Sequence, residues 1–521
     1  MGYVEGTSRE QASIWSLEEM VAEESMVRII DRYIDRCDLA KLGFTRTQPA
    51  ETGRPAYPPD ALAKLYVYGY ENCIRSSRKL ERETRRNVEA MWLTGNLTPD
   101  HKTIAEFRRQ NVRPLQKLFR EFVKLCRSWE LVGGNLFVED GTKIKASNNK
   151  KNNFSMKKIK DRLARIEKKI GDARLDEKID AYMAELEEAD RREEMSAKAP
   201  DGLKELLERK ELYEEYLAGL EKSGENELST VDRDARLMGN NRGGVDVSYN
   251  VIGMVDGKRH LIVDFDVLLN PSDQGSLAPM AKRLIRMGYR KFYLLADKGF
   301  YNGEDLLKVR KYKIKAIVAR QKPSDPKGQP EEFHSDKFEY DSKSDTYRCP
   351  AGETLDAHSK KGAARRNFFN KTACAGCPHV SVCAVGQRGY RAVTRNQYSE
   401  VYEAADRLFD ENKNLYKLRQ QIVEHTFGTI KHTMNGGYFL LRTRRKVRCE
   451  TALLCLGYNL KRAYSALGFR KLMAKLDSLP RRFSRILSFR GVWSGFNGYR
   501  QNLARIFCAN RPHHRRLNAV M

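Results

Sequence analysis

Short apolar runs and one long amphipathic segment mark three acidic residues in this chain. A Leu-Phe-Val run leads to Asp140, and a Phe-Tyr-Leu-Leu-Ala run leads directly to Asp297. Because such runs are typical of buried strands, both aspartates are predicted at the carboxyl ends of strands. Residues 401–427 contain neither proline nor glycine up to Phe427, and their apolar spacing predicts a helix with one buried side that carries Glu424.

The same patterns organise the rest of the chain. Residues 16–126 have a helical pattern, with breaks at the proline pair 58–59 and at 95–99. Apolar residues spaced by three and four over 156–170, and less regularly over 203–220, predict a charged helical hairpin. The elements predicted after the hairpin are strands 245–255 and 259–269, helix 277–287, the strand before Asp297, helix 304–312, strand 314–318 and the late helix that carries Glu424.

Two strand ends and one helix could bring the three carboxylates together as hard oxygen ligands, which suit Mg²⁺ or Mn²⁺. Two such ions roughly 3.5–4 Å apart can activate a water or hydroxyl nucleophile and stabilise the leaving oxygen of a phosphodiester. A lone aspartate at a strand end is more often satisfied by a nearby backbone amide or arginine. The residues around all three acids favour the metal-dependent interpretation.

The formal net charge of +27 is concentrated near the end of the chain. Residues 441–521 contain 19 lysines or arginines and two acids, Glu450 and Asp477. A polyanionic partner is the simplest explanation, and its affinity should fall steeply with salt. The basic tail alone could equally bind RNA, ribosomes or anionic lipid. No run of about 18 apolar residues and no apolar leader is found, so a cytoplasmic protein without a membrane segment is expected.

Four of the ten cysteines are clustered, in YRCPAGETL and CAGCPHVSVC. The CxxC spacing, a further cysteine six positions later and one upstream resemble a structural Zn²⁺ knuckle. The alternative is a set of unliganded thiols, because disulfides are rare in a reducing cytoplasm. The predicted zinc ligands are Cys349, Cys374, Cys377 and Cys383.

Several motifs resemble those of the DDE transposases of bacterial insertion sequences, and most closely the group usually numbered eleven-eighty-two. The first catalytic block of that family resembles DGTKIKASNNKKNNFS, and the second resembles DKGFYN. The block with the glutamate resembles YKLRQQIVEHTFGTIKH, and the helical DNA-binding module resembles YENCIRSSRKLERETRRNVEAMWLTGNLTPDHKTIAEFRRQN. The block DRDARLMGNNRGGVDVSYNV follows a variable helical insertion in that family.

The resemblance implies roles for individual residues. Asp140, Asp297 and Glu424 would be the catalytic residues and the ligands of two Mg²⁺ or Mn²⁺ ions. Tyr416, Arg419 and Lys431 would help to hold the transposon end, and Lys431 and Tyr416 are expected on the same helix face as Glu424. The helical module would contact the duplex as a helix-turn-helix-like reader. The basic residues assigned to that contact are Arg75, Arg78, Lys79 and Arg108.

Three positions depart from the family pattern or add to it. Four residues separate Arg419 from Glu424, where the related signature has three. Ile252 stands where the family often has glutamine. Asp273, in NPSDQGSL, is a fourth acid beside a predicted strand, and we assign it a structural or supporting role.

The predicted fold is of the α/β class. It combines an all-α N-terminal DNA-binding domain and an RNase H-like mixed-sheet core with a helical hairpin insertion and a small, four-cysteine, zinc-ribbon-like insertion. The predicted boundaries are 1–130 for the DNA-binding domain, 131–153 with 228–330 for the core, 154–227 for the coiled-coil-like insertion, 331–400 for the Cys-rich insertion, 401–470 for the helix with Glu424 and a packing helix, and 471–521 for the basic tail.

The predicted function is transposition. The enzyme would bind terminal inverted repeats in double-stranded DNA, hydrolyse phosphodiesters at the ends and join the 3′-hydroxyls to target DNA. Two ends must be cut together, so a homodimer in the DNA complex is expected, located with the nucleoid of a bacterial cytoplasm. The alternatives are an RNase H-like nuclease that cleaves without joining and an inactive or domesticated DNA-binding protein.

Overall fold

The computed structural model describes residues 10, 14–49, 51–52, 55–188, 201–240, 243–321, 328–359, 364–386 and 389–480, with the backbone alone for 173–188 and 201–203. These residues belong to two compact units. The first lies within 1–65, 81–114 and 469–521, and the second lies within 66–80 and 115–468.

The first unit is entirely helical in its described part, as the pattern over 16–126 predicts. Its core includes Ile29, Ile30, Tyr33 and Ile34, which line the buried side of one amphipathic helix. The helices of this unit are α1 (Leu17–Met20), α2 (Met26–Arg36), α3 (Leu39–Leu42), α6 (Val88–Thr94), α7 (His101–Gln110), α18 (Phe469–Asp477) and parts of α4 (Pro59–Glu71), α5 (Ser77–Arg86) and α8 (Val112–Ser128).

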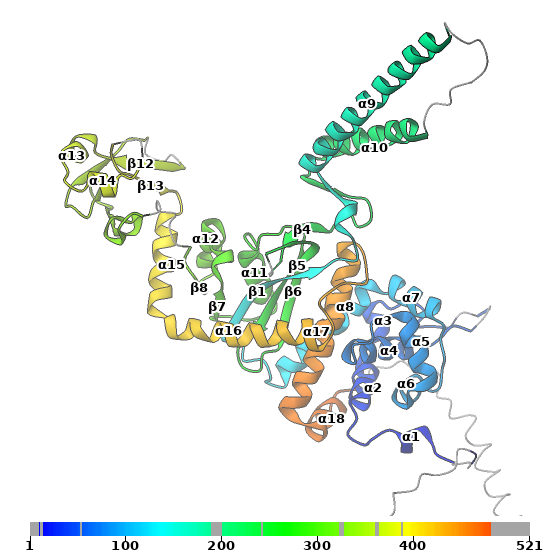
Figure 1. The fold of residues 1–521 in the computed structure, drawn as a ribbon. Coiled ribbons are helices and arrows are strands. Elements are labelled where there is room, and N and C mark those ends of the chain that lie inside the picture. The colour runs from blue at the N-terminus through cyan, green and yellow to red at the C-terminus, as the bar shows by residue number, and fades with distance from the viewer. Residues whose placement is uncertain are drawn as a thin grey trace, which may run out of the picture. The chain divides into compact units, whose positions relative to one another are not determined.

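The second unit is built on a six-stranded mixed sheet (Figure 1). Strand β5 pairs with β4, β6 and β1, all antiparallel, and β1, β7 and β8 follow one another in parallel. The strands are β1 (Leu136–Lys145), β4 (Arg236–Gly239), β5 (Val245–Asp256), β6 (Ile262–Leu268), β7 (Tyr293–Ala296) and β8 (Lys315–Val318). The predicted order of strands and helices after the hairpin is therefore confirmed, with β4 as an addition.

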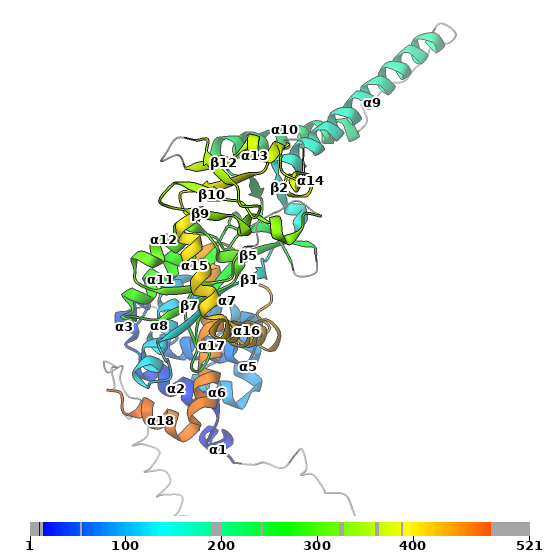
Figure 2. The same cartoon turned by 90° about the vertical axis from the view of Figure 1, so that its left-hand side faces the viewer.

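Helices cover both faces of this sheet (Figure 2). On the face of Glu139, Ser276 at the start of α11 lies within hydrogen-bond distance, at 2.9 Å. On the opposite face, the ring of Phe427 lies over Gly253. The covering helices are α11 (Leu277–Arg286) and α12 (Gly303–Lys311) on the first face, and α16 (Lys413–Gly428) and α17 (Arg444–Leu467) on the second.

Two predicted boundaries are wrong. Strand β1 does not end at Asp140 but continues to Lys145, because its neighbour β5 pairs with it over the whole stretch from Phe137 to Lys145. The single helix expected over 401–427 is two helices, α15 (Ser399–Glu411) and α16, which are separated at Asn412. A π-helical turn, Thr429–Thr433, follows α16.

The predicted helical hairpin is present, and a short strand pair that sequence patterns did not predict lies at its base (Figure 1). Phe154, Ile159 and Leu220 form a buried cluster there, and Tyr213 and Tyr216 pack against it. The elements are η1 (Lys150–Asn152), β2 (Asn153–Ser155), α9 (Met156–Glu188), α10 (Asp201–Ser223) and β3 (Glu227–Ser229).

The Cys-rich segment has a small sheet of its own, with five antiparallel strands in chain order. Its core consists of Phe338, Tyr347, Leu355, Phe368 and Val393. The elements are η3 (Glu331–Phe333), η4 (Ser335–Lys337), β9 (Glu339–Asp341), β10 (Thr346–Arg348), β11 (Thr354–Ala357), β12 (Arg365–Phe369), α13 (Lys371–Ala375), α14 (Val380–Cys383) and β13 (Ala392–Asn396).

None of the helices among the described residues is long and apolar enough to cross a membrane.

Candidate active site

Asp140 lies within β1, and Asp297 directly follows β7, the parallel neighbour of β1. Val138 of β1 is in register with Leu295 of β7, so each aspartate stands two residues beyond a paired position. Side chains two residues apart in a strand share a face, and parallel strands end at the same edge of a sheet. The register therefore brings together the first two predicted metal ligands.

Burial and charge act strongly on Asp140. The pKa of its carboxyl is raised to about 6, and burial is the largest cause. The carboxylates of Asp297 and Asp273 also raise this pKa, whereas the Arg419 guanidinium lowers it. The accumulation of negative charge in a poorly hydrated place disfavours the ionised form. A bound cation would relieve this cost, so the carboxylate pair fits a hard divalent metal ion.

Asp297 is held by the turn that follows its strand. Its side chain caps the 3-10 helix η2 (Lys298–Phe300), and Oδ1 accepts a hydrogen bond of 2.8 Å from the Gly299 N–H. This backbone contact fixes the carboxylate at the end of β7, as the sequence predicts.

Among the contacts of the described residues, none joins Glu424 to Asp140 or Asp297. The Glu424 side chain is exposed, and its Oε1 accepts a hydrogen bond of 2.8 Å from Gln420 Nε2 one turn earlier in α16. Arg419, five residues before Glu424, instead reaches Asp140, with Nη1 3.2 Å from Oδ1. Five residues correspond to roughly 140° around a helix, so the two side chains point to different sides of α16.

The three residues expected to hold a DNA end do surround Asp140. Tyr416 has the Arg419 guanidinium over its ring at 6.0 Å, and burial raises the pKa of its hydroxyl. Burial lowers the pKa of Lys431. The carboxylate of Asp140 raises this pKa, and the ammonium of Lys143 lowers it.

Lys431 lies within the π-helical turn after α16. A π turn contains more residues than an α turn, so it changes the angle at which the following side chains leave the helix. Lys431 therefore does not follow Glu424 along an unbroken α-helix, on which the prediction of a shared helix face depended. π turns are frequently found at functional sites.

Sequence reasoning missed the part played by Lys143 and Asn250. The Lys143 ammonium lies 2.9 Å from Asp273 Oδ1, and Asn250 Nδ2 donates to the same oxygen at 2.6 Å. Lys143 and Asn250 are directly opposite one another in the β1–β5 register. Only the pairing of these strands could reveal the contact, because the two residues are far apart in sequence.

The prediction that Arg75 contacts DNA does not agree with its place in the structure. Its side chain is 2% exposed and its Nη1 lies 3.0 Å from Glu450 Oε1 in a buried ion pair. A guanidinium in this place cannot reach a phosphate without breaking that pair. Arg78 and Lys79 are exposed on α5, while Arg108 is half-buried on α7 of the helical unit.

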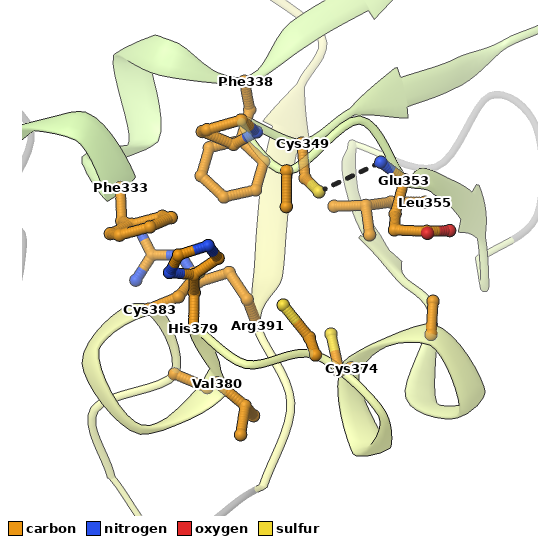
Figure 3. A pocket seen from close by; sticks show the side chains of 15 residues that line it. Phe333, Phe338, Cys349, Glu353, Leu355, Cys374, His379, Val380, Cys383 and Arg391 are labelled. Carbon is orange, nitrogen blue, oxygen red and sulfur yellow. Dashed lines mark hydrogen bonds between the residues drawn. The ribbon is translucent and has the colours of Figure 1, made fainter.

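The four clustered cysteines line one small cavity of about 30 Å³, between the strands and the short helices of their segment (Figure 3). Cys349 Sγ accepts a hydrogen bond of 3.3 Å from the Glu353 N–H. Burial raises the pKa of the Cys383 thiol to about 11. Among the residues that the structure describes, no group of three or more His, Cys, Asp or Glu side chains is arranged to hold a metal ion, and this includes both predicted sites.

Comparisons with known proteins identify the class of protein. A family model described as a transposase domain (DUF772) matches residues 15–110, and one described as a transposase DDE domain matches residues 348–464. These two matches support a DDE transposase of the insertion-sequence type. DDE transposases generally use divalent metal ions such as Mg²⁺. The second match includes Glu424 and the four cysteines, and it begins after Asp140 and Asp297.

Two further comparisons complete these findings. No curated protein sequence shows significant similarity to the chain. A solved structure described as a piggyBac transposase synaptic complex with hairpin DNA aligns with 10% sequence identity and a TM-score of 0.21, over 90% of this chain and 86% of that chain. A TM-score of this size does not define a common fold.

Proposed function

We propose that the chain binds the terminal repeats of its element, hydrolyses a phosphodiester at each end and joins the 3′-hydroxyls to target DNA. The observation that carries this proposal is the parallel register of β1 and β7, which aligns Asp140 with Asp297 beside a cationic helix face. Two divalent metal ions would supply an activated nucleophile and stabilise the leaving oxygen. Asp140 and Asp297 are the residues that would hold them.

An RNase H-like core is part of this proposal. Support comes from the sheet order β6-β5-β1-β7-β8, in which β5 is antiparallel to β6 and β1, and β1, β7 and β8 are parallel. Strand β4 also pairs with β5. The glutamate-bearing helix then crosses the face on which Asp140 lies, since Phe427 of α16 packs over Gly253, the partner of Asp140 in the register.

Arg419, Lys431 and Tyr416 have a binding role in this proposal. The Arg419 guanidinium pairs with Asp140. A phosphate would offer the same cation a second anionic partner, with which arginine forms bidentate hydrogen bonds. Arg419 would thus leave Asp140 as DNA enters, and Asp140 would become free for a metal ion.

Glu424 is proposed as the third ligand on the strength of the resemblance. Its exposed place on α16 means that the carboxylate must turn towards the aspartates when DNA and metal bind. A homodimer in the DNA complex is proposed because two ends must be processed together.

A strand-joining assay with labelled DNA from the element's own termini tests the proposed function. Wild type with Mg²⁺ or Mn²⁺ should yield joined product, and D140A and D297A should bind the ends without cleaving them. E424A should lose cleavage as D297A does, because Glu424 is the proposed third ligand of the two metal ions. Cleavage by D297A would overturn the metal assignment, and cleavage without joining by wild type would identify a nuclease.

We also propose a structural Zn²⁺ in the Cys-rich segment. Support comes from the ligand spacing and from the small cavity that all four cysteines line. Purified protein should release about one Zn²⁺ per chain on denaturation, by the four-thiolate stoichiometry of structural sites. C377S should lower that amount, whereas C73S, which changes a cysteine outside the cluster, should not. Metal-free wild type would contradict the proposal.

A further inference from the structure

Four arginines gather around two aspartates of strand β6, at a place separate from the candidate active site. Asp264 and Asp266 flank Phe265 in β6, and in the described part of the chain this strand pairs with β5 alone. Strand β1, which carries Asp140, pairs with the other side of β5. Neighbouring strands lie about 4.8 Å apart, so the arginines gather at a sheet edge roughly 10 Å from β1.

Three of the arginines come from helices on opposite faces of the sheet. Arg283 of α11 pairs with Asp264, because its Nη2 donates to Oδ1 at 2.6 Å and its Nε lies 2.5 Å from Oδ2. Its Nη1 also lies 3.1 Å from Asp266 Oδ2. Two arginines of α17 approach the other oxygen of Asp266: Arg448 Nη1 lies 2.8 Å from Oδ1, and Arg444 Nη2 lies 3.4 Å from it.

A fourth guanidinium, that of Arg120 in α8, lies near this group. Helix α8 packs on β6, where the ring centroids of Phe119 and Phe265 are 5.4 Å apart. Burial lowers the pKa of Arg448, and Arg120 is one of three further arginines whose charge lowers it. The carboxylate of Asp266 raises the same pKa. Like charges disfavour one another in this way only when they are crowded together.

The group keeps a net positive charge at the surface. Four guanidiniums face two carboxylates, and the side chains of Arg444 and Arg448 are 40% and 25% exposed. The carboxylates hold the guanidiniums in place, so less rotamer freedom would be lost when an anion binds. Further exposed cations lie on α11 and α17, namely Lys282, Arg286, Arg445 and Lys446.

A structural role alone accounts for only part of this group. Arg283 by itself already pairs with both aspartates. The additional guanidiniums suit phosphate groups, whose oxygens accept bidentate hydrogen bonds from arginine. We propose that Arg444, Arg448 and Arg120 form a second DNA contact, which binds the phosphate backbone of a duplex whatever its sequence. This inference rests on the proposed function, because it takes DNA as the partner.

Binding of the full chain to two duplexes of equal length, one from the element's ends and one of unrelated sequence, tests the inference. Fluorescence anisotropy measures the affinity between about 50 and 200 mM salt. The double variant with R444Q and R448Q should bind both duplexes about tenfold more weakly. The slope of log K against log salt should become shallower by about two, because each phosphate contact contributes roughly 0.9. Phosphate contacts carry no sequence information, so both duplexes should be affected equally.

R209Q is the matched control. Arg209 is exposed on α10 and pairs at 2.5 Å with a single carboxylate, that of Glu205. The substitution removes the same charge from a pair of one cation and one carboxylate. R209Q should therefore leave the salt slope unchanged, whereas R444Q alone should make it shallower by about one.

D266N changes the charge in the opposite direction. It removes a carboxylate that lies beside three guanidiniums, so it should tighten the binding of both duplexes about threefold. A purely structural role predicts the reverse, because the loss of Asp266 would leave the arginines without the group that orders them.

Three results would overturn the inference. They are an unchanged salt slope in the double variant, a loss confined to end DNA, and weaker binding by a folded D266N. Thermal unfolding shows which variants keep a midpoint close to wild type, and only these are compared. If the double variant unfolds early, R444Q decides in its place, because the side chain of Arg444 is partly exposed and its pair is the longest in the group.

Strand joining by wild type is measured separately, so that the two proposals can fail independently. If wild type binds and joins DNA while the double variant keeps the wild-type slope, only the inference fails. If the double variant loses slope and wild type joins no DNA, the inference holds and the proposed strand transfer fails. If wild type binds neither duplex, or binds an unrelated RNA more tightly than both, the two proposals fail together.

Discussion

Glu139 and Asp140 are adjacent in β1 and yet point to opposite faces of the sheet. Burial raises the pKa of the Glu139 carboxyl to about 8, despite the hydrogen bond with Ser276. Its carboxyl group is thus neutral at neutral pH, whereas the same residue in an unfolded chain is ionised. The protonated Glu139 carboxyl group is hydrogen-bonded to Ser276, whereas the Asp140 carboxylate on the other face pairs with Arg419 of α16.

This difference predicts a pH dependence of stability. The folded pKa of Glu139 lies above its unfolded value of 4.5, so its contribution is fully present below pH 4.5 and is lost as pH rises to about 8. At pH 8.5, E139Q, which cannot ionise, should unfold at a higher urea concentration than wild type. Its free energy of unfolding should be greater by several kcal/mol. The difference should shrink towards pH 5. Urea midpoints at three pH values measure it, and parallel curves would contradict the assignment.

The buried pair of Arg75 and Glu450 distinguishes a structural arginine from Arg78, an arginine that we propose contacts DNA. R75A leaves the Glu450 carboxylate buried without its cation and should lower the free energy of unfolding by about 3–5 kcal/mol. R78A, on the exposed side of the same segment, should keep the stability and weaken DNA binding instead. Urea unfolding and fluorescence anisotropy with end DNA measure the two effects. Equal stability of the two variants would show that the pair is not formed.

At the scale of elements, the packing of α16 on the sheet depends on a glycine. A Cβ added to Gly253 would lie 2.4 Å from the Phe427 ring, which no real contact allows. The absence of a side chain in the middle of β5 therefore lets α16 approach the strand that carries Asp140. The sequence shows the glycine but gives no sign of the aromatic ring above it.

G253A tests this close approach. It should lower the free energy of unfolding by about 1–3 kcal/mol, because the ring or the whole helix must move. It should also reduce strand joining, since α16 carries Arg419 and Glu424. G239A is the matched control, because Gly239 lies in strand β4 with nothing within 4 Å of an added Cβ. Equal stability of both variants would contradict the described packing.

At the scale of the whole molecule, charge decides how the protein meets DNA. Residues 481–521 contain nine arginines and no acid, and they lie outside the described residues. Each phosphate that a cation neutralises releases counterions, so affinity depends on salt through the number of contacts. We propose that the tail adds sequence-independent affinity for DNA, while the sheet and α16 carry the catalytic residues.

Deletion of 481–521 should therefore weaken binding of end DNA and make the slope of log K against log salt shallower by at least about two. Binding of wild type and the truncated chain by anisotropy, over a range of salt concentrations, measures both. Metal-dependent cleavage by the truncated chain should persist at low salt. An unchanged slope would show that the tail does not contact phosphates.

The sequence by itself determined the class of the protein, the order of its core elements and the place of Asp297, because these depend on local patterns and short motifs. The tertiary structure decided which side chains meet. It turned Arg419 towards Asp140, buried Arg75 against Glu450 and brought Asp273 close to Gly141 and Gly299. Contacts of this kind depend on strand register, helix rotation and a π turn, and none of these can be predicted from a short stretch of sequence.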